Sequence, residues 1–297
     1  MSTKKPIFIL LSIIFLTKSL NSKEEWDYIN HGTDWNIKFE NCGKGQQSPT
    51  KILSTKAEEL GKSNFFYANL NVKKNTKKNS TLELIENNNI LSLSFQHLGN
   101  VIYNIKDPWS SLKSKKFENS EINLKNLKYD EEDLQEAECH NIMIKLPGEH
   151  IYDNSENVGE LQVNCTFRKE RSTENRGVYI SIPIKIDENN ESGFSKNLKS
   201  IIVEGNINID KLPQEIEFDT IDITDGFAMM DGVFYYEAQN NYPPCDDYSI
   251  WFYINKPINF SQKVVDQLKL CIDKEKCPDG NNRSPFDVRD LYLYRKQ

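Results

Sequence analysis

The chain has 297 residues, of which 37% are hydrophobic, and its 37 Lys and Arg against 44 Asp and Glu give a formal net charge of −7. A chain of this length can bury a sizeable core, as one large domain or two small ones. The acidic balance argues against a nucleic-acid-binding groove, because phosphate binding needs a basic face. The sequence shows no internal repeat of roughly 20–50 residues, which excludes a solenoid.

Residues 1–22 have the pattern of a secretory signal peptide. Two lysines precede an apolar run from Pro6 to Leu16, and polar residues follow it. The run falls within the roughly 7–15 residues of a signal-peptide core and is shorter than the ~20 that span a bilayer. We expect cleavage near Ser22 and a secreted product with no membrane span, although an uncleaved anchor is the alternative. Cleavage removes three lysines and no acidic residue, so the net charge of the mature chain becomes about −10.

Beyond this segment the sequence predicts short strands separated by polar turns, because apolar and polar residues alternate or form short β-branched and aromatic runs. In chain order the predicted strands are Leu82–Glu86, Ile90–Gln96, Val101–Ile105, Ile142–Leu146, Glu160–Arg168, Val178–Ile186 and Ser249–Asn255. Helices are predicted at Ser195–Val203 and Ser261–Leu270, with Ser261 as a candidate N-cap. No Pro-, Gly- or Ser-rich linker divides residues 23–297, so one domain is predicted.

The segment 106–137 is dense in Lys, Glu, Asp and Asn. We interpret it as a solvated insertion or long loop.

The cysteines and sequons fit a secreted protein. An even number of cysteines in an oxidising compartment is consistent with three disulfides. The sequence contains no Cys-x-x-Cys pair, so a zinc knuckle is not expected. The six are Cys42, Cys139, Cys165, Cys245, Cys271 and Cys277. Glycosylation is predicted at the sequons of Asn79, Asn190, Asn259 and Asn282. A fifth sequon, at Asn164, should stay bare if its strand lies in the interior.

Three groups of residues occur in the order and at the intervals of a known family. They are Trp26-Asp27-Tyr28 with Trp35, Cys42 and the run Gly45–Ile52; Gly148-Glu149-His150 followed by Glu160-Leu161; and Tyr235-Tyr236, Pro243-Pro244-Cys245 and Trp251. Each group alone is a weak signal. Together, over residues 26–290, they make the chain closely resemble the alpha-carbonic anhydrases of the secreted type. The segment 106–137 matches nothing in that family.

The resemblance implies a fold and a set of disulfides. The fold is mainly β, a single domain around a twisted, largely antiparallel sheet of about ten strands with a few short helices. In secreted members of the family a disulfide joins the positions of Cys42 and Cys245. Cys139 and Cys165 would then lie on neighbouring antiparallel strands and form a second pair. Cys271 and Cys277 would close a small loop.

The resemblance also identifies the positions of the family's zinc ligands. Two histidines come from one strand at positions i and i+2, which share a face, and the third comes from the adjacent strand. The matched motifs place these positions at Met143, Lys145 and Gln162. A thioether and an amide are poor zinc ligands, and an ammonium cannot ligate without losing its proton. We therefore expect no metal and no cofactor here.

Other elements of the family's chemistry are also replaced. The threonine that orients the zinc-bound hydroxide corresponds to Asn241, and the next threonine corresponds to Tyr242. Glu149 and Glu160 match carboxylates that orient the hydroxide network and a ligand histidine. The chain's histidines are not expected to rebuild a three-histidine site; they are His31, His97, His140 and His150. His140 is an odd number of residues from Met143 and should face the other way, and His150 matches a structural histidine.

Without zinc, two buried carboxylates would repel each other, and at least one should bind a proton. We hypothesise that the Lys145 ammonium occupies the metal region and pairs with Glu160 or Glu149. In the alternative, Lys145 points outward, and the carboxylates bond to backbone or water.

These features favour a secreted, glycosylated pseudoenzyme that resembles the zinc-less carbonic anhydrase-related proteins and acts as a binding or recognition module. Its partner would be an unknown extracellular protein or small ligand, not a nucleic acid. One alternative is an active carbonic anhydrase, a carbonate dehydratase that hydrates carbon dioxide reversibly, with a rearranged zinc site. Another is a structural protein that self-associates through the segment 106–137.

Overall fold

The computed structural model of the chain describes residues 26–59, 65–73, 83–84, 91–104, 135–167, 177–208, 215–217, 232–272, 277–287 and 290–294. The predicted signal peptide, the sequon at Asn79 and residues 106–134 of the predicted insertion lie outside these ranges. Among the described residues, no helix is long and apolar enough to cross a membrane.

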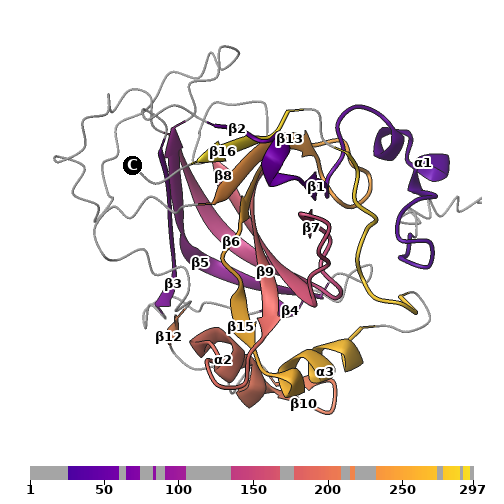
Figure 1. The fold of residues 1–297 in the computed structure, drawn as a ribbon. Coiled ribbons are helices and arrows are strands. Elements are labelled where there is room, and N and C mark those ends of the chain that lie inside the picture. The colour runs from indigo at the N-terminus through magenta and orange to yellow at the C-terminus, as the bar shows by residue number, and fades with distance from the viewer. Residues whose placement is uncertain are drawn as a thin grey trace, which may run out of the picture.

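One large sheet organises the described part of the chain (Figure 1). Its strands are β2 (Glu58–Glu59), β3 (Phe65–Lys73), β4 (Glu83–Leu84), β5 (Leu91–Asn104), β6 (Gln135–Lys145), β8 (Gly159–Phe167), β9 (Gly177–Ile186), β12 (Glu215–Glu217), β13 (Val233–Gln239), β14 (Tyr248–Ile254), β15 (Ile258–Phe260) and β16 (Tyr292–Tyr294). They pair in the order β12-β3-β5-β6-β8-β9-β14-β13-β16-β2, with β4 beside β5 and β15 beside β9. The pairs β9–β14, β9–β15 and β2–β16 are parallel, and the others are antiparallel. The predicted mainly β, largely antiparallel fold is confirmed.

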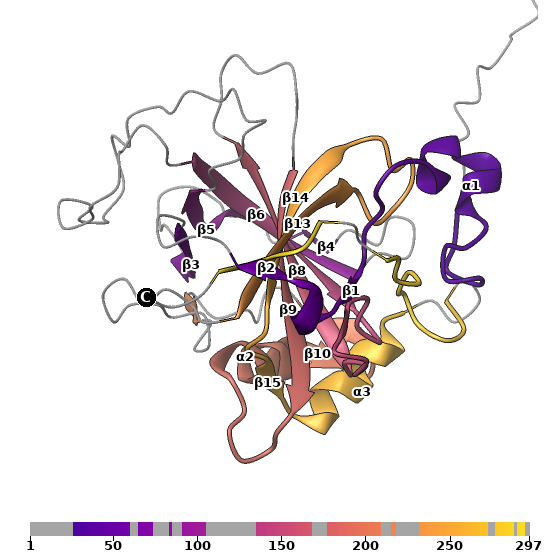
Figure 2. The same ribbon diagram turned by 45° about the horizontal axis from the view of Figure 1, so that its top comes forward.

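The remaining elements are short. Two small sheets join β1 (Lys51–Ile52) to β7 (Ile151–Tyr152) and β10 (Ile202–Val203) to β11 (Asn206–Ile207), and the helices are α1 (Trp35–Lys38), α2 (Gly193–Ile201) and α3 (Gln262–Leu270). Helices α2 and α3 lie together beside β15 and β10 at one end of the molecule, and α1 lies away from them (Figures 1 and 2).

Several predicted elements have different bounds in the structure. The strands predicted at Ile90–Gln96 and Val101–Ile105 are one strand, β5, whose pairing with β6 shifts register between Ser94 and Gly99. The predicted insertion ends earlier than expected, because Gln135–Ala137 already belong to β6 and pair with β5. Their charged and polar side chains are half-buried and bonded across the sheet, as in the 2.6 Å bond from Asn100 Nδ2 to Glu136 Oε1.

Both predicted helices exist, and the bounds of α2 differ from the prediction. Helix α2 begins earlier than the predicted Ser195, because Ser192 is the N-cap and its Oγ accepts from the Ser195 N–H at 3.2 Å. Its predicted last residue, Val203, lies in β10 instead. Ser261 is the N-cap of α3, although its side chain makes no capping hydrogen bond.

The central strands separate two apolar clusters on opposite faces of the sheet. Ile142 and Ile144 on β6, with Leu161 and Val163 on β8, belong to the larger cluster. Met143 belongs to the other, together with aromatic side chains of β9, β13 and β14. This alternation is what a two-residue period produces. Across the two strands, Met143 faces Gln162 and Lys145 faces Glu160.

Two of the three predicted disulfides form. Cys42 is bonded to Cys245, and Cys139 is bonded to Cys165, which faces it on the next strand. The predicted bridge between Cys271 and Cys277 is not formed. Cys271 is the C-cap of α3, and its thiol instead donates to the Gln267 carbonyl oxygen, one helical turn back, at 3.4 Å.

Candidate functional site

The candidate site lies on the smaller-cluster face of β6 and β8, where the matched zinc-ligand positions meet. Met143 and Lys145 are two residues apart on β6, and Gln162 and Glu160 face them from β8. Lys145, Gln162 and Glu160 are fully buried, and Met143 is 4% exposed. Charged and amide groups have thus been placed where water does not reach them, so each must find its partners within the protein.

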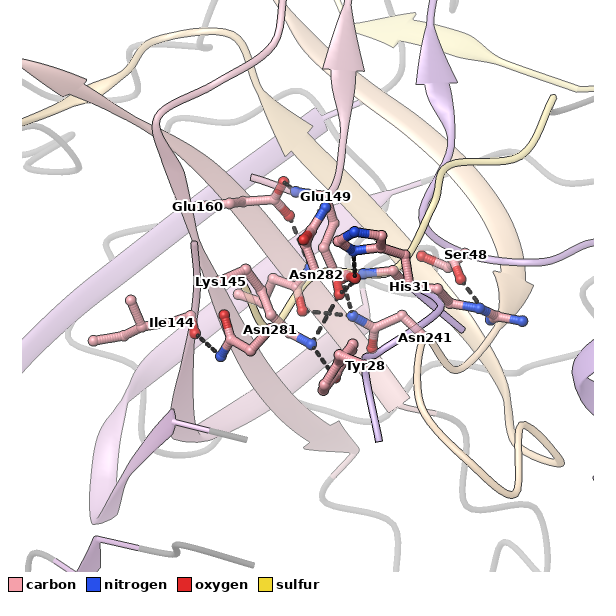
Figure 3. Close-up of polar contacts among 12 residues, drawn as sticks. Tyr28, His31, Ser48, Ile144, Lys145, Glu149, Glu160, Asn241, Asn281 and Asn282 are labelled. Atoms are coloured by element: carbon pink, nitrogen blue, oxygen red, sulfur yellow. Dashed lines mark hydrogen bonds and ion pairs between the residues drawn. The ribbon is translucent and has the colours of Figure 1, made fainter. Parts of the chain in front are cut away.

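Lys145 is the centre of this arrangement. Its Nζ lies 2.9 Å from Glu149 Oε1 and donates to the Tyr28 hydroxyl at 2.7 Å. Figure 3 shows the polar ends of Lys145, Tyr28 and Glu149 directed at one another. Burial alone would lower the pKa of Lys145, but the charge of Glu149 and the contacts with Tyr28 outweigh it and raise that pKa. The hypothesis that Lys145 pairs with Glu160 or Glu149 is confirmed, with Glu149 as the partner, and the outward-pointing alternative is wrong.

Glu149 receives four donors. Its Oε1 accepts the Arg283 backbone N–H at 2.9 Å in addition to the Lys145 ammonium. Its Oε2 accepts from Gln162 Nε2 at 2.7 Å and from Asn241 Nδ2. Because a carboxylate has about four lone-pair sites, this side chain is saturated by the protein itself.

Glu160 is bound as tightly, by a different set of groups. Its Oε2 accepts the backbone N–H groups of Glu149 and His150 at 3.0 and 2.8 Å. Its Oε1 is bonded to His150 Nδ1 at 2.7 Å, Gln162 Nε2 at 2.8 Å and Ser181 Oγ at 2.7 Å. Burial raises the pKa of Glu160, but His150 and these hydrogen bonds overcome that effect and lower it to about 2. Glu160 is therefore not a carboxylate that binds the expected proton, because five hydrogen-bond donors stabilise its charge.

His150 extends the network to the far strands. Its Nε2 lies 2.6 Å from the Tyr236 hydroxyl, which in turn lies 2.9 Å from Ser48 Oγ. All three side chains are buried. Both ring nitrogens of His150 are thus engaged by the protein, in agreement with the structural role predicted for it.

The two residues at the matched threonine positions behave differently. Asn241 is fully buried, and its Nδ2 donates to Gln162 Oε1 at 2.7 Å as well as to Glu149. Tyr242 is half-buried, and its hydroxyl lies 3.4 Å from the hydroxyl of Tyr179. The Tyr179 ring is stacked on Trp251, with 4.3 Å between centroids. Large aromatic side chains thus occupy the region next to the buried network.

The side-chain groups at the three matched zinc-ligand positions are not suited to coordinating zinc. Gln162 uses its amide nitrogen on two carboxylates and its oxygen on Asn241. Lys145 holds its proton in an ion pair, and Met143 packs in an apolar cluster. A zinc ion needs deprotonated nitrogen, sulfur or oxygen ligands with free lone pairs. Over the described ranges, no group of three or more His, Cys, Asp and Glu is placed to hold a metal ion.

The other three histidines come from separate parts of the chain. His31 Nδ1 is 3.2 Å from the Asn282 carbonyl oxygen. His140 lies at a register shift between Cys139 and Asn141, so counting residues from Met143 does not establish which face it occupies. His97 lies on β5, and its side chain is outside what the structure describes.

Two residues that the sequence reasoning missed hold the site from the C-terminal loop. The Asn281 side chain bonds to the backbone on both sides of Lys145. Its Oδ1 accepts from Leu146 N at 2.8 Å, and its Nδ2 donates to Ile144 O at 2.9 Å. The buried Arg283 guanidinium donates to the carbonyl oxygens of Ser48 and Cys42, and burial lowers its pKa to about 10. The loop has no periodic pattern, so nothing in it signals these contacts.

Comparisons with known proteins agree with the fold. A family model described as eukaryotic-type carbonic anhydrase matches residues 30–291. Among solved structures, the chain is similar to dioscorin complexed with ascorbate, with 15% identity, a TM-score of 0.61, and coverage of 92% of this chain and 99% of that one. It is also similar to a halotolerant carbonic anhydrase from Dunaliella salina, with 14% identity, a TM-score of 0.63, and coverage of 92% and 98%.

A third similar structure is the alpha-carbonic anhydrase from Thermovibrio ammonificans in complex with sulfanilamide, with 13% identity, a TM-score of 0.56, and coverage of 91% and 99%. At these identities the structural likeness concerns the fold alone. No curated protein sequence matches the chain significantly. The family model spans most of the sequence and includes every residue of the buried network except Tyr28, so the chain belongs to the eukaryotic-type carbonic anhydrase family.

Proposed function

We propose that this protein is a secreted, non-catalytic member of its family that binds a partner and does not hydrate carbon dioxide. The observation that carries the proposal is the Lys145 ammonium, paired with Glu149 at one of the matched zinc-ligand positions. A fixed cation there repels a divalent cation, and the neighbouring positions offer no imidazole.

The saturation of the carboxylates supports the same conclusion. In an active member the matched carboxylates serve a hydroxide and a ligand histidine. Here Glu149 is occupied by Lys145, Gln162, Asn241 and a backbone N–H, and Glu160 is occupied by five donors. A catalytic site must keep some of its polar groups free for the reacting atoms. These groups serve the stability of the protein instead.

Two disulfides support secretion, because such bonds persist in oxidising compartments. The likeness to dioscorin, a protein solved with ascorbate, supports the idea that this fold can hold a small molecule. We propose an extracellular protein or small ligand of basic or neutral character, since the mature chain is acidic.

Carbon dioxide hydration by the purified full chain tests the proposal. A stopped-flow indicator assay, with zinc supplied, should give the rate of the buffer blank, and a sulfonamide should not change it. An active family enzyme in the same buffer is the positive control. A sulfonamide-sensitive rate that scales with protein concentration would overturn the proposal and favour the alternative of an active enzyme with a rearranged zinc site.

A further inference from the structure

The acceptor asparagines of the described N-glycosylation sequons take no part in the buried network around Lys145. In the described part of the chain, an Asn-x-Ser/Thr sequence occurs at Asn164, Asn190, Asn259 and Asn282. A glycan is bulky and solvated, so the folded protein can accommodate it only where the asparagine side chain projects into water. The surroundings of these four side chains differ enough to distinguish them.

Asn190 has the geometry of an acceptor. It is exposed and lies in the turn that follows β9. Its backbone N–H and that of Asn189 donate to Asp187 Oδ1, which holds the turn in place. Its Nδ2 donates to Asp187 Oδ2 at 3.1 Å. This bond uses one of the two amide protons, so the other can be replaced by a sugar without breaking it.

The third residue of this sequon is Ser192, the N-cap of α2. It is 4% exposed, its Oγ accepts from Ser195 N, and its own N–H donates to the Asn259 carbonyl oxygen at 3.0 Å. The sequon therefore ends inside the fold while the acceptor itself stands outside. The Ser192 hydroxyl thus serves the start of the helix in the folded protein as well as the sequon.

The other three asparagines are held by the fold. Asn259 is half-buried in β15, and its Nδ2 donates to the Asn190 carbonyl oxygen at 3.1 Å. Asn282 lies between the fully buried Asn281 and Arg283, and its own Oδ1 is buried. Asn164 is half-buried next to a disulfide cysteine, and its Nδ2 donates to the Tyr179 hydroxyl at 3.4 Å. Each of these three side chains is partly covered by the fold, whereas the Asn190 side chain is exposed, so the fold accommodates a glycan best on Asn190.

We infer that Asn190 is the N-glycosylation site among the described residues and that Asn164, Asn259 and Asn282 stay bare. This inference replaces the glycosylation predicted from the sequence at Asn259 and Asn282. In the transfer, Asn190 Nδ2 bonds to the anomeric carbon of a lipid-pyrophosphate-linked oligosaccharide. The bond from that carbon to the pyrophosphate oxygen breaks, the lipid pyrophosphate leaves, and Nδ2 loses one proton. This inference rests on the proposed secretion, since the donor is supplied in the secretory pathway.

The test is to produce the full chain in a eukaryotic secretory host, with its own N-terminus and, in parallel, with a proven secretion leader ahead of it. Deglycosylation of the secreted protein in heavy-oxygen water converts glycosylated asparagine to labelled aspartate, which peptide mass spectrometry locates. The label should fall on Asn190 in most molecules and be missing from Asn164, Asn259 and Asn282. Secreted protein without label at Asn190, or with label at any of the other three, would overturn the inference. The chain with its own N-terminus tests the proposed secretion. The chain with the added leader is exported in either case, so it tests the glycosylation of Asn190 independently of that proposal.

Two matched variants at Ser192 separate the glycan from the helix cap. Ser192→Asn removes the sequon but keeps a residue that caps helices well, so the glycan should disappear while secretion continues. Ser192→Thr keeps both the sequon and a cap, so the label should remain on Asn190. A glycan retained in Ser192→Asn would also contradict the inference.

Discussion

Lys145 and Glu149 form an ion pair of 2.9 Å in which neither side chain is exposed to solvent. The lysine comes from the end of β6, and the glutamate comes from the turn that follows it. A buried charge without a partner destabilises the folded state strongly, so each of these two residues offsets the cost of burying the other's charge. The pair gives the Glu149 carboxylate an opposite charge that the protein itself supplies.

The first prediction concerns Lys145→Met, which removes the charge and leaves an unbranched side chain that is one atom shorter. The variant should lose about 3–5 kcal/mol of unfolding free energy, because Glu149 is left buried and uncompensated. Denaturant unfolding measures the loss. Because the pKa of Lys145 is raised, its contribution is complete below its unfolded pKa of about 10.4 and is lost only in strong alkali. The loss due to this residue should therefore be equal at about pH 6 and pH 8.

Two controls make this prediction specific. The double variant Lys145→Met/Glu149→Gln removes both charges and should regain much of the lost stability, which a merely steric effect would not do. Lys44→Met breaks the exposed pair between Lys44 and Glu40, whose side chains are 57% and 79% exposed, and should cost less than about 1 kcal/mol. Equal losses in Lys145→Met and Lys44→Met would show that the buried pair has no special role.

The second prediction concerns acid stability. The folded-state pKa of Glu160 is about 2, below its ordinary value, so its charge stabilises the fold above about pH 4.5, and this stabilisation is lost as the pH falls toward 2. The shift corresponds to about 3 kcal/mol. Glu160→Gln should be less stable at neutral pH and should lose less stability than the parent between about pH 5 and pH 2. Unfolding curves across this range measure the difference. Parallel pH profiles for the two proteins would count against the ionised state of Glu160.

The third prediction compares the two disulfides. Cys42–Cys245 spans 203 residues of sequence and Cys139–Cys165 spans 26. A crosslink that closes a longer loop removes more entropy from the unfolded chain, and in this model the difference is about 2 kcal/mol. Replacing both cysteines of the long bridge with alanine should therefore destabilise the protein more than the same change at the short bridge. Chemical unfolding of the two variants decides the order, and a reversed order would contradict the entropic argument.

The fourth prediction concerns Tyr28, which holds the Lys145 ammonium from the other side. Tyr28→Phe removes a 2.7 Å hydrogen bond to a charged group and keeps the packing of the ring. The expected loss is about 2 kcal/mol of unfolding free energy. In Lys145→Met this hydrogen bond is already gone, so adding Tyr28→Phe should cost much less there. Equal costs in the two backgrounds would show that the hydroxyl does not act through Lys145.

Residue patterns predicted the face of the sheet that carries the site. Ile142 and Ile144 alternate with Met143 and Lys145, and a two-residue period assigns these pairs to opposite faces. The family motifs then located Gln162 opposite them, and the structure places it there. Local pattern and motif spacing sufficed because these residues lie on two neighbouring strands with a regular register.

The sequence did not reveal the contacts made by loops. Glu160 stays ionised because two backbone N–H groups, a histidine and a serine converge on it from separate segments. Asn281 and Arg283 reach the site from a loop more than 130 residues away in sequence. The prediction of a Cys271–Cys277 disulfide was wrong for a similar reason, since two cysteines that are close in sequence need not have side chains that point toward each other.

Other elements were missed although their patterns are regular. In β3, Phe66, Ala68 and Leu70 alternate and are buried, as a half-buried strand requires. The early start of β6 was hidden by polar residues, because a strand whose polar side chains bond across the sheet resembles a loop in composition.

Zinc content tests the central claim most directly. The purified full chain is equilibrated with excess zinc and a competing chelator of moderate affinity, separated from free metal, and analysed for zinc per polypeptide by elemental mass spectrometry. The triple variant Met143→His/Lys145→His/Gln162→His, which places imidazoles on the three facing positions, is treated in the same way and should gain zinc. If the Lys145 ammonium takes the place of the metal, the natural sequence retains far less than one zinc ion per chain. One zinc ion per chain in the natural sequence, displaced by a sulfonamide, would contradict the account.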